Sequence, residues 1–318
     1  MRPVPSLPLI DIGDLRNDDP AAHQKIAQQL RDACQRCGFF YIHNHGIDAE
    51  LIAAVQQQAE RFFALPSAAK LALDKALSGC NRGYEPLRGQ TLEAGSPPDL
   101  KEGFYIGNEV AEDDPRVLAG KFNQGPNQWP VALPEFRPVM ERYFRAVNEV
   151  CEQLMSVLAL SLELPGDHFD PLLEDAAATL RLLHYPPQPP QSAPGEKGCG
   201  AHTDFGALTL LLQDDAGGLQ VQAIDSGEWI DAPPIEGTYV VNLGDLISRW
   251  TNDRYHSNRH RVINRSGRER YSVPFFYTGN LGLTVECLPV CLRPGETPRY
   301  PAVTVEEHLR EMYRRTYG

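Results

Sequence analysis

The chain has 318 residues, of which 42% are hydrophobic and 23% charged, and its net charge is −12. This length allows one large domain or two small ones around a sizeable core. An acidic balance disfavours a nucleic-acid partner, because a phosphate backbone attracts basic side chains. No run approaches the roughly 18–20 apolar residues of a membrane-spanning helix, and the N-terminus lacks the apolar core of a signal peptide. We therefore expect a cytoplasmic protein without a membrane partner, as a monomer or weak homo-oligomer.

The first 125 residues mix predicted helices and strands. Apolar positions recur at helical spacing in residues 20–37 and again in residues 48–63, and the short apolar strands LPLIDI and GFFYIHNHGI precede them in turn. Residues 76–130 are rich in Gly, Pro and Asn, which indicates long loops with short strands such as EGFYIG. An apolar stripe then predicts a long helix from about residue 133 to residue 162.

After Asp170 the pattern changes to short strand-like runs that alternate with turn signals. The runs are TLRLLHYPP, ALTLLLQDDAGGLQVQ, GEWIDAPP, TYVVNLGD and RHRVINRSGRERYSVPFFYTG. Strands of this length and spacing predict an antiparallel sandwich or barrel, and residues 305–313 return to a helical pattern. We predict a mainly β core at about residues 175–285 of a 126–318 region, with the mixed region 1–125 wrapped on it in one compact unit.

The cysteines and most histidines indicate structural roles. Seven cysteines without a secretory signal predict free thiols. Cys34 and Cys37 form a C-x-x-C at the end of a predicted helix, but no second pair completes a metal set, so we expect core packing. For the histidines outside the motifs below, we expect structural hydrogen bonds at His43 and His45 and solvated rings at His23, His168 and His308.

His202 and Asp204 stand two residues apart before an apolar run, in the segment GCGAHTDFGALTLLLQ. On a strand, residues i and i+2 point to the same face, so an imidazole and a carboxylate can reach one point. A further histidine from a neighbouring strand would complete the two-His-one-carboxylate set of non-haem Fe(II) oxygenases. H-x-D alone is a weak signal. It gains weight because NLGD, HRVIN and RYS follow in order, at 242–245, 260–264 and 270–272.

The ordered motifs resemble the isopenicillin N synthase-like family of Fe(II)- and 2-oxoglutarate-dependent dioxygenases. PLIDI and GFFYIHNHGI are similar to its N-terminal region, and its catalytic core is matched by LRLLHYPP, HTDFGALTLLLQD, GGLQV, WIDAPP, VVNLGD, YHSNRHRV and RYSVPFF. The resemblance implies a distorted double-stranded β-helix, or jelly roll, flanked by N-terminal and central helices. It also implies that Fe(II) is bound by His202, Asp204 and His260, with 2-oxoglutarate and O2 as cosubstrates.

Arg270 and Ser272 are the candidates for binding the cosubstrate. The distal carboxylate of 2-oxoglutarate would enter an apolar barrel, where an unpaired charge is costly, and a two-pronged Arg with a hydroxyl beside it answers that need. The family's R-x-S motif indicates the same two residues, and Tyr185 in LLHYPP matches a family tyrosine whose hydroxyl reaches the cosubstrate. The chain departs from many plant members in having Leu183 in place of Asn, and Cys37 in place of Trp.

The resemblance implies oxidation of a small molecule by hydroxylation, desaturation or ring closure, with release of succinate and carbon dioxide. Three alternatives stay open from the motifs: an iron oxidase that takes all electrons from its substrate, an enzyme that fragments 2-oxoglutarate to ethylene, and a non-catalytic small-molecule receptor. The intact triad weighs against the receptor. We expect the substrate pocket to include Phe205, Leu208, Trp250, Phe276, Arg82, Tyr84 and Tyr105.

His256 and His260 compete for the role of third iron ligand. Four residues along a strand span roughly 13 Å, at about 3.3 Å per residue, so only one of them can reach the metal. The turn signal NRSG at 264–267 predicts a hairpin. A register that pairs His260 with Ser272 would put these two residues, Val262 and Arg270 on one face, whereas a slip of one residue would turn Arg270 and Ser272 to the opposite face. The first register favours His260 as the ligand and leaves His256 with a structural hydrogen bond near Trp250.

Overall fold

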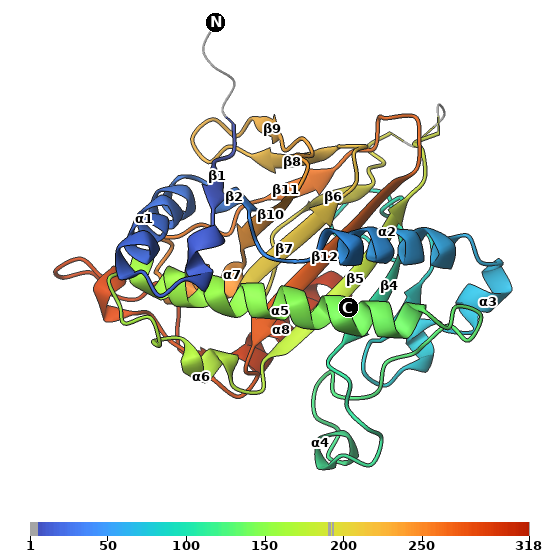
Figure 1. Ribbon diagram of the computed structural model, residues 1–318, viewed down its shortest axis with the longest axis horizontal. Helices are drawn as coiled ribbons and strands as arrows, with labels where there is room; N and C mark the ends of the chain where they lie inside the picture. Colours follow the sequence, from blue (N-terminus) through green and yellow to red (C-terminus); the bar gives the residue numbers. More distant parts are fainter. Residues whose placement is uncertain (1–5, 190–191, 193, 318) are drawn as a thin grey trace, which may run out of the picture.

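The computed structural model describes residues 6–189, 192 and 194–317, and a large sheet runs through its centre (Figure 1). Eight strands form this sheet in the spatial order β1-β2-β10-β7-β12-β5-β4-β3. β1 and β2 are parallel, and the other neighbouring pairs are antiparallel. The strands are β1 (Leu9–Asp11), β2 (Phe39–His43), β3 (Gly83–Glu85), β4 (Glu102–Gly107), β5 (Ala177–Tyr185), β7 (Leu208–Gln213), β10 (Thr238–Leu243) and β12 (Arg270–Gly279).

A second sheet of four strands packs against one face of the large sheet, in the order β6-β11-β8-β9. A small buried core fills the space between the sheets, with Phe39 and Val240 from the large sheet facing Leu219 and Val221 from the small one. Two facing sheets of this kind confirm the predicted jelly roll. The strands of the small sheet are β6 (Cys199–His202), β8 (Leu219–Gln222), β9 (Trp229–Asp231) and β11 (His260–Val262).

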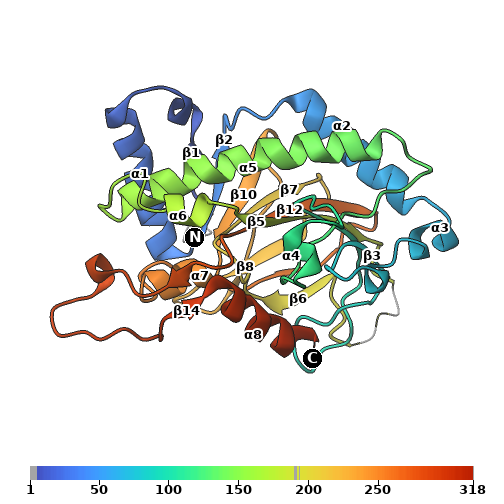
Figure 2. The ribbon, with the colours of Figure 1, turned by 90° about the horizontal axis from the view of Figure 1, so that it is seen from below.

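Three long helices cover the other face of the large sheet (Figures 1 and 2): α1 (Pro20–Arg36), α2 (Ala49–Phe63) and α5 (Phe136–Ser161). Asp19 and Asp48 cap the first two, because their carboxylates accept backbone N–H groups that the helix itself leaves unbonded. Side chains alternate along the strands, so Leu180 and Leu182 of β5 pack under the helices while Leu183 and Tyr185 face the small sheet.

Shorter elements complete the fold. α8 lies on the side of the molecule away from α2 and α5 (Figure 2). None of the helices in the described ranges is both long and apolar enough to cross a bilayer. The elements are α3 (Ser67–Leu71), α4 (Pro115–Leu118), α6 (Asp170–Leu173), α7 (Asp245–Trp250), α8 (Val305–Tyr317), β13 (Thr284–Val285), β14 (Val303–Thr304) and the 3-10 turns Gly13–Arg16, Lys75–Leu77 and Pro289–Cys291.

Most of the predicted elements are present. The three long helices and the strand runs after residue 170 occur within a few residues of their predicted bounds. β6 and α7 were missed, because a four-residue strand next to glycines and a six-residue helix carry too little periodicity to detect. All seven cysteines are free, as predicted. The first 125 residues contribute β1 to β4 to the large sheet, so they share that sheet with the β core.

The predicted hairpin between residues 260–263 and 268–273 is wrong. β11 pairs with β6 and β8 in the small sheet, whereas β12 pairs with β5 and β7 in the large one. The NRSG turn therefore carries the chain from one sheet to the other. A local turn signal cannot distinguish a hairpin from such a crossing, because the same residues serve both. Pairing with strands far away in the sequence decides between them.

Candidate active site

His202, Asp204 and His260 meet between the two sheets. His202 ends β6 and His260 begins β11, and the two are direct partners across these antiparallel strands. Asp204 lies just beyond β6, on the way to β7. Nε2 of each histidine is 3.8 Å from Oδ1 of Asp204, and one ligand atom from each residue lies within 4.8 Å of the others. Within the described ranges, no other set of three His, Cys, Asp or Glu side chains has this spacing.

Backbone carbonyls determine which histidine nitrogens face the centre of the triad. Nδ1 of His202 is 2.8 Å from the carbonyl oxygen of Gly200, and Nδ1 of His260 is 3.2 Å from that of Asn258. A carbonyl oxygen can only accept, so each Nδ1 donates its proton and each Nε2 keeps a lone pair. Both lone pairs are thus available to a metal ion next to Asp204, with the ring orientation fixed from behind.

Asp204 is buried and bound by two neutral donors. Thr209 Oγ1 and Asn242 Nδ2 donate to its Oδ2 at 2.6 and 2.7 Å, which leaves Oδ1 toward the histidines. Burial alone would raise the pKa of Asp204, but the two histidines and these hydrogen bonds hold that pKa below its usual value. Burial lowers the pKa of His202 and lowers that of His260 to about 4. At neutral pH all three side chains are in the protonation state that binds metal.

The inner cavity, as we call it, lies between the sheets and is lined by the triad together with Tyr185, Arg270 and Ser272. Arg270 is completely buried, with 0% of its surface exposed. Its Nη1 donates to Ser272 Oγ at 3.2 Å, its Nε donates to the Gly217 carbonyl at 2.6 Å, and its guanidinium lies 4.7 Å from the Tyr185 ring centre. Among the described residues, no carboxylate forms an ion pair with it.

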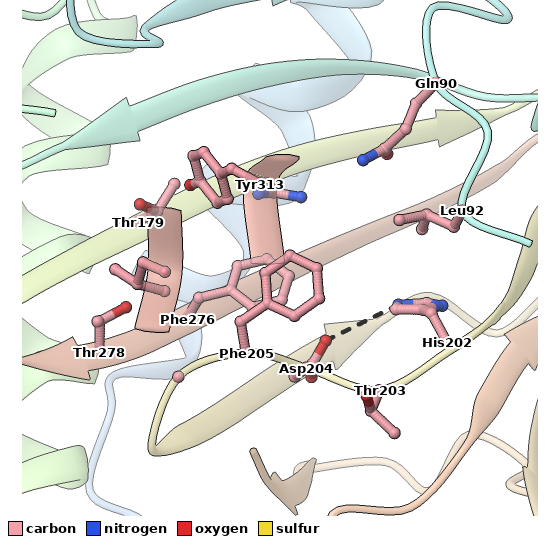
Figure 3. Close-up of a pocket in the computed structure, with 13 residues that line it drawn as sticks. Gln90, Leu92, Thr179, His202, Thr203, Asp204, Phe205, Phe276, Thr278 and Tyr313 are labelled. Atoms are coloured by element: carbon pink, nitrogen blue, oxygen red, sulfur yellow. Dashed lines mark ion pairs between the residues drawn. The ribbon is translucent and has the colours of Figure 1, made fainter. Parts of the chain in front are cut away.

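The outer cavity adjoins the triad and shares His202, Asp204 and Phe276 with the inner one (Figure 3). Of the predicted pocket residues, Phe205 and Phe276 line it. The guanidinium of Arg181 lies 4.6 Å from the Phe276 ring centre and 4.4 Å from that of Tyr105. The outer cavity therefore combines aromatic side chains with one cationic side chain. Its other lining residues are Gln90, Leu92, Thr179, Thr203, Gly206, Thr278, Leu309 and Tyr313.

Three other predicted pocket residues lie elsewhere. Leu208 begins β7 and is buried in the core under the helices. Trp250 ends α7 and packs against Phe169, with ring centres 5.1 Å apart. The hydroxyl of Tyr84 donates to Glu102 at 2.5 Å, on the face of the sheet away from the triad. Each position follows from strand or helix pairing that the sequence pattern did not reveal.

Arg82 and Tyr105 lie behind the outer cavity. Tyr105 backs the Arg181 guanidinium, and its hydroxyl donates to Glu85 at 2.6 Å. Arg82 donates to backbone carbonyls of Cys80 and Asn123, and it lines a small adjoining cavity. Both side chains thus support the wall without lining the outer cavity.

Sequence reasoning missed Thr179 and Arg181, although a signal for them was present. Alternation along β5 places Thr179 and Arg181 on the same face as Leu183 and Tyr185, so the expected position of Tyr185 implied theirs. Thr209 and Asn242 were missed as supports of Asp204. A signal for Asn242 was present, because it belongs to the NLGD motif, one of the ordered motifs that resemble the family's catalytic core.

His308 corrects the expectation of a solvated ring. It is 7% exposed, and its Nε2 donates to the carbonyl oxygen of Phe205 at 3.1 Å. Burial, followed by the nearby Arg249 charge, lowers the pKa of His308 to about 4, so the ring is neutral at physiological pH. The contact joins α8 to the residue after Asp204. Docking of a helix from the end of the chain could not be inferred from its own pattern.

The fold and the triad agree with the family comparisons. Residues 176–279 match the 2OG-Fe(II) oxygenase superfamily, and residues 7–132 match the family described as non-haem dioxygenase in morphine synthesis N-terminal. The chain belongs to the 2OG-Fe(II) oxygenase superfamily, as its resemblance to isopenicillin N synthase-like enzymes predicted.

Relatives extend this membership along the whole chain. A 2-oxoglutarate-Fe(II) type oxidoreductase of Emericella nidulans is 51% identical, over 98% of this chain and 90% of its own. A 2-oxoglutarate-dependent dioxygenase of Monascus ruber is 44% identical, over 98% and 96%. A Neurospora crassa protein crystallised with alpha-KG and thymine is 30% identical, over 97% and 96%, with a TM-score of 0.85. The protein is an Fe(II)- and 2-oxoglutarate-dependent dioxygenase that acts on small molecules and uses O2.

Proposed function

We propose that His202, Asp204 and His260 are the ligands of the catalytic Fe(II). The observation that supports this assignment is the convergence of two Nε2 lone pairs and one carboxylate oxygen on one point between the sheets. Three ligands on one side of a metal leave positions open for a cosubstrate and oxygen. When bound, the iron supplies the activation of O2 that the protein's side chains cannot provide.

The inner cavity is the proposed site for 2-oxoglutarate. Arg270 places a buried positive charge at this cavity without a carboxylate partner among the described residues, and an uncompensated buried charge is costly. The distal carboxylate of 2-oxoglutarate would supply the missing negative charge, with Ser272 as a further donor. Tyr185 lies under the guanidinium and orients it. Leu183, where many plant members have Asn, adds only apolar surface to this cavity.

The outer cavity is the proposed substrate site, and its chemistry favours a small, flat and polar substrate. Phe205 and Phe276 offer ring faces, while Arg181 offers a cation that would bind a carboxylate or a carbonyl oxygen. The Neurospora crassa relative was crystallised with thymine, a flat ring with two carbonyl groups, which supports this class. Oxidation of such a substrate would be coupled to decarboxylation of 2-oxoglutarate, which releases succinate and carbon dioxide.

An anaerobic titration tests the assignment of the two sites. The wild-type protein with one equivalent of Fe(II) should develop a visible charge-transfer band when 2-oxoglutarate is added. Arg270→Lys should weaken 2-oxoglutarate binding, because a point charge replaces a two-pronged donor. Unchanged affinity in that variant would remove Arg270 from the cosubstrate site. Under air, succinate release that depends on an added flat, polar compound would identify a substrate, whereas ethylene release without one would mean that 2-oxoglutarate itself is fragmented.

A further inference from the structure

The two strands that carry the cosubstrate residues are also joined on their opposite face. Tyr185 and Arg270 are direct partners of β5 and β12, and the next pair along these strands is His184 with Tyr271. Because side chains alternate, this second pair points away from the inner cavity. Its rings are stacked, with centres 4.8 Å apart and planes at 19°. Contacts that fix the position of His184 therefore also fix β5 and β12 at the positions of Tyr185 and Arg270.

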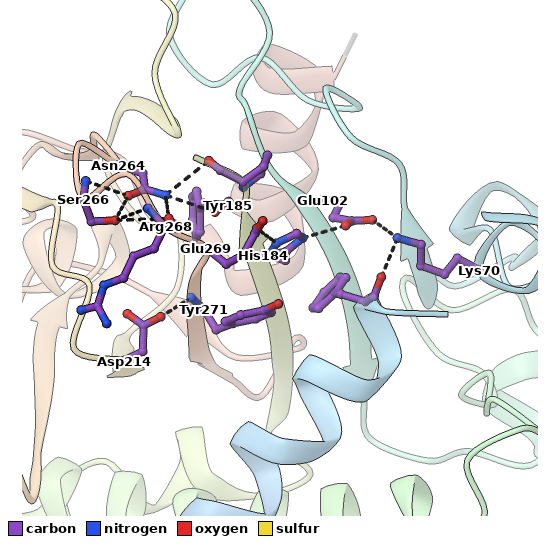
Figure 4. A network of polar contacts seen from close by, with 12 residues as sticks. Lys70, Glu102, His184, Tyr185, Asp214, Asn264, Ser266, Arg268, Glu269 and Tyr271 are labelled. Carbon is purple, nitrogen blue, oxygen red and sulfur yellow. Dashed lines mark hydrogen bonds and ion pairs between the residues drawn. The ribbon is translucent and has the colours of Figure 1, made fainter. Parts of the chain in front are cut away.

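His184 lies between two carboxylates (Figure 4). Its Nδ1 is 2.7 Å from Glu102 Oε1 on β4, and its Nε2 is 2.5 Å from Glu269 Oε2, one residue before Arg270. A carboxylate oxygen accepts hydrogen bonds, and each ring nitrogen of His184 has one within hydrogen-bond distance. His184 thus bridges β4 and the segment before β12, which lie on either side of β5.

Glu102 extends this bridge to α3 and β3. Its Oε2 accepts from Lys70 Nζ at 2.7 Å and from the Tyr84 hydroxyl at 2.5 Å. Lys70 and Glu102 side chains are only 10% and 8% exposed, so solvent screens their contact little. Glu102 thus links Lys70 and Tyr84 to His184, and through His184 to Glu269.

Further hydrogen bonds fasten the same strand ends from the side. Asn264 Nδ2 donates to the carbonyl oxygen of Arg268 at 2.8 Å and to that of Tyr185 at 3.2 Å, which ties the end of β5 to the segment before β12 (Figure 4). The backbone N–H of Tyr271 donates to Asp214 Oδ2 at 2.5 Å. Polar contacts thus surround the ends of both strands, although these ends lie at the rim of the sheet, where strands otherwise fray.

We propose that His184 is a positioning residue for the cosubstrate: through Glu102 and Glu269 it keeps Tyr185 and Arg270 in register for binding 2-oxoglutarate. This inference rests on the proposed role of Arg270. A two-pronged guanidinium contact requires accurate placement of the strand that carries it, because small displacements break one of its two hydrogen bonds. Without the His184 ring, no group would link Glu102 and Glu269, whose like charges lie on either side of β5, and the strand ends would lose this connection.

The test uses the full-length Fe(II) protein without oxygen and compares wild type with three variants. His184→Gln removes the ring that contacts both carboxylates, Arg270→Lys tests the cosubstrate site itself, and His168→Gln makes the same exchange at an exposed histidine before α6. Affinity for 2-oxoglutarate is read from the charge-transfer band and Fe(II) affinity from a separate titration. His184→Gln should weaken 2-oxoglutarate binding by about tenfold and leave Fe(II) binding within about twofold, while His168→Gln changes neither.

Two double variants show how His184 acts. In the Arg270→Lys background, His184→Gln should cost much less than it does alone, because the contact that it positions is already damaged. Adding Glu269→Gln to His184→Gln should restore part of the lost affinity, because it removes the like-charge pair; a general loss of packing would not be rescued. Full 2-oxoglutarate affinity in His184→Gln, or equal losses of 2-oxoglutarate and Fe(II) affinity, would overturn the proposal. If Arg270→Lys alone binds normally, the cosubstrate assignment fails instead.

Discussion

His202 and His260 are direct partners on neighbouring antiparallel strands, and their ring centres lie 4.3 Å apart. This pairing brings together two residues that are 58 positions apart in the chain. It lies at the end of β6, next to Asp204, which follows that strand. The rings are held from behind by carbonyls of Gly200 and Asn258. The proposed iron site is therefore built mainly by the small sheet, whereas the proposed cosubstrate residues belong to the large one.

This pairing leads to a comparison of two histidines in one motif. His260→Ala should lose Fe(II) binding and activity, whereas His256→Ala should keep both. The backbone N–H of His256 donates to the Cys34 carbonyl at the end of α1, away from the triad. Iron content after anaerobic reconstitution and the charge-transfer band measure the difference. Stoichiometric iron and full activity in His260→Ala would refute the ligand assignment.

Asp204→Ala should abolish turnover and iron binding without unfolding the protein. The core between the helices and the large sheet does not depend on this side chain, and removing a buried carboxylate also removes its desolvation cost. Circular dichroism and thermal unfolding of the metal-free protein report the fold, and succinate release reports turnover. Asp215→Ala, at an exposed carboxylate just after β7, is the control. An Asp204→Ala protein that fails to fold would make this residue structural.

Arg181→Gln should separate the substrate site from the cosubstrate site. Loss of a charged hydrogen-bond donor costs about 1.5–3 kcal/mol, so substrate-dependent succinate release should fall by roughly tenfold to a hundredfold at subsaturating substrate. Because Arg181 lines the outer cavity and not the inner one, 2-oxoglutarate affinity should stay unchanged. Arg181→Gln should thus weaken the response to substrate but not 2-oxoglutarate binding, whereas Arg270→Lys should weaken 2-oxoglutarate binding. Weakened 2-oxoglutarate binding in Arg181→Gln would show that the two sites were assigned wrongly.

His308 predicts a dependence of stability on pH. Its pKa is about 4 in the folded protein, because the ring is buried, and about 6.5 in an unfolded chain. Between these values the unfolded state binds a proton that the folded state does not, so the contribution of His308 to the free energy of unfolding falls as the pH drops from about 6.5 to about 4 and is constant above that window. The contribution of His308 is at most roughly 3.5 kcal/mol, at about 1.4 kcal/mol per pKa unit.

His308→Gln removes that titration while keeping a donor for the Phe205 carbonyl. Urea unfolding of the metal-free protein at about pH 7 and about pH 5 should therefore show a smaller loss of stability for the variant than for the wild type. Other buried histidines titrate equally in both proteins and cancel from the comparison. Equal losses in the two proteins would mean that burial of His308 does not contribute to acid sensitivity.

Much of the fold could be predicted because its signals are local. Helical spacing of apolar residues marked α1, α2 and α5, and short alternating runs marked the strands of the β core. The H-x-D spacing placed His202 and Asp204 together, and the resemblance to isopenicillin N synthase-like enzymes implied that His260, Arg270 and Ser272 join them. The helices, the strands and the H-x-D pair are encoded locally, by a periodic face or a fixed spacing. His260 lies far from that pair in the chain and was reached only through the resemblance.

What the tertiary structure alone decided is the pairing of distant strands. The turn at 264–267 looked like a hairpin, yet β11 joins β6 in one sheet and β12 joins β5 in the other. Trp250 was predicted to line the substrate pocket and His308 to be solvated. The packing of α7 instead places Trp250 against Phe169, and the packing of α8 places His308 against the Phe205 carbonyl. Each outcome depends on which buried surface and which backbone hydrogen bonds a segment finds far away in the chain. That choice is a free-energy difference between whole arrangements, so no window of local sequence contains it.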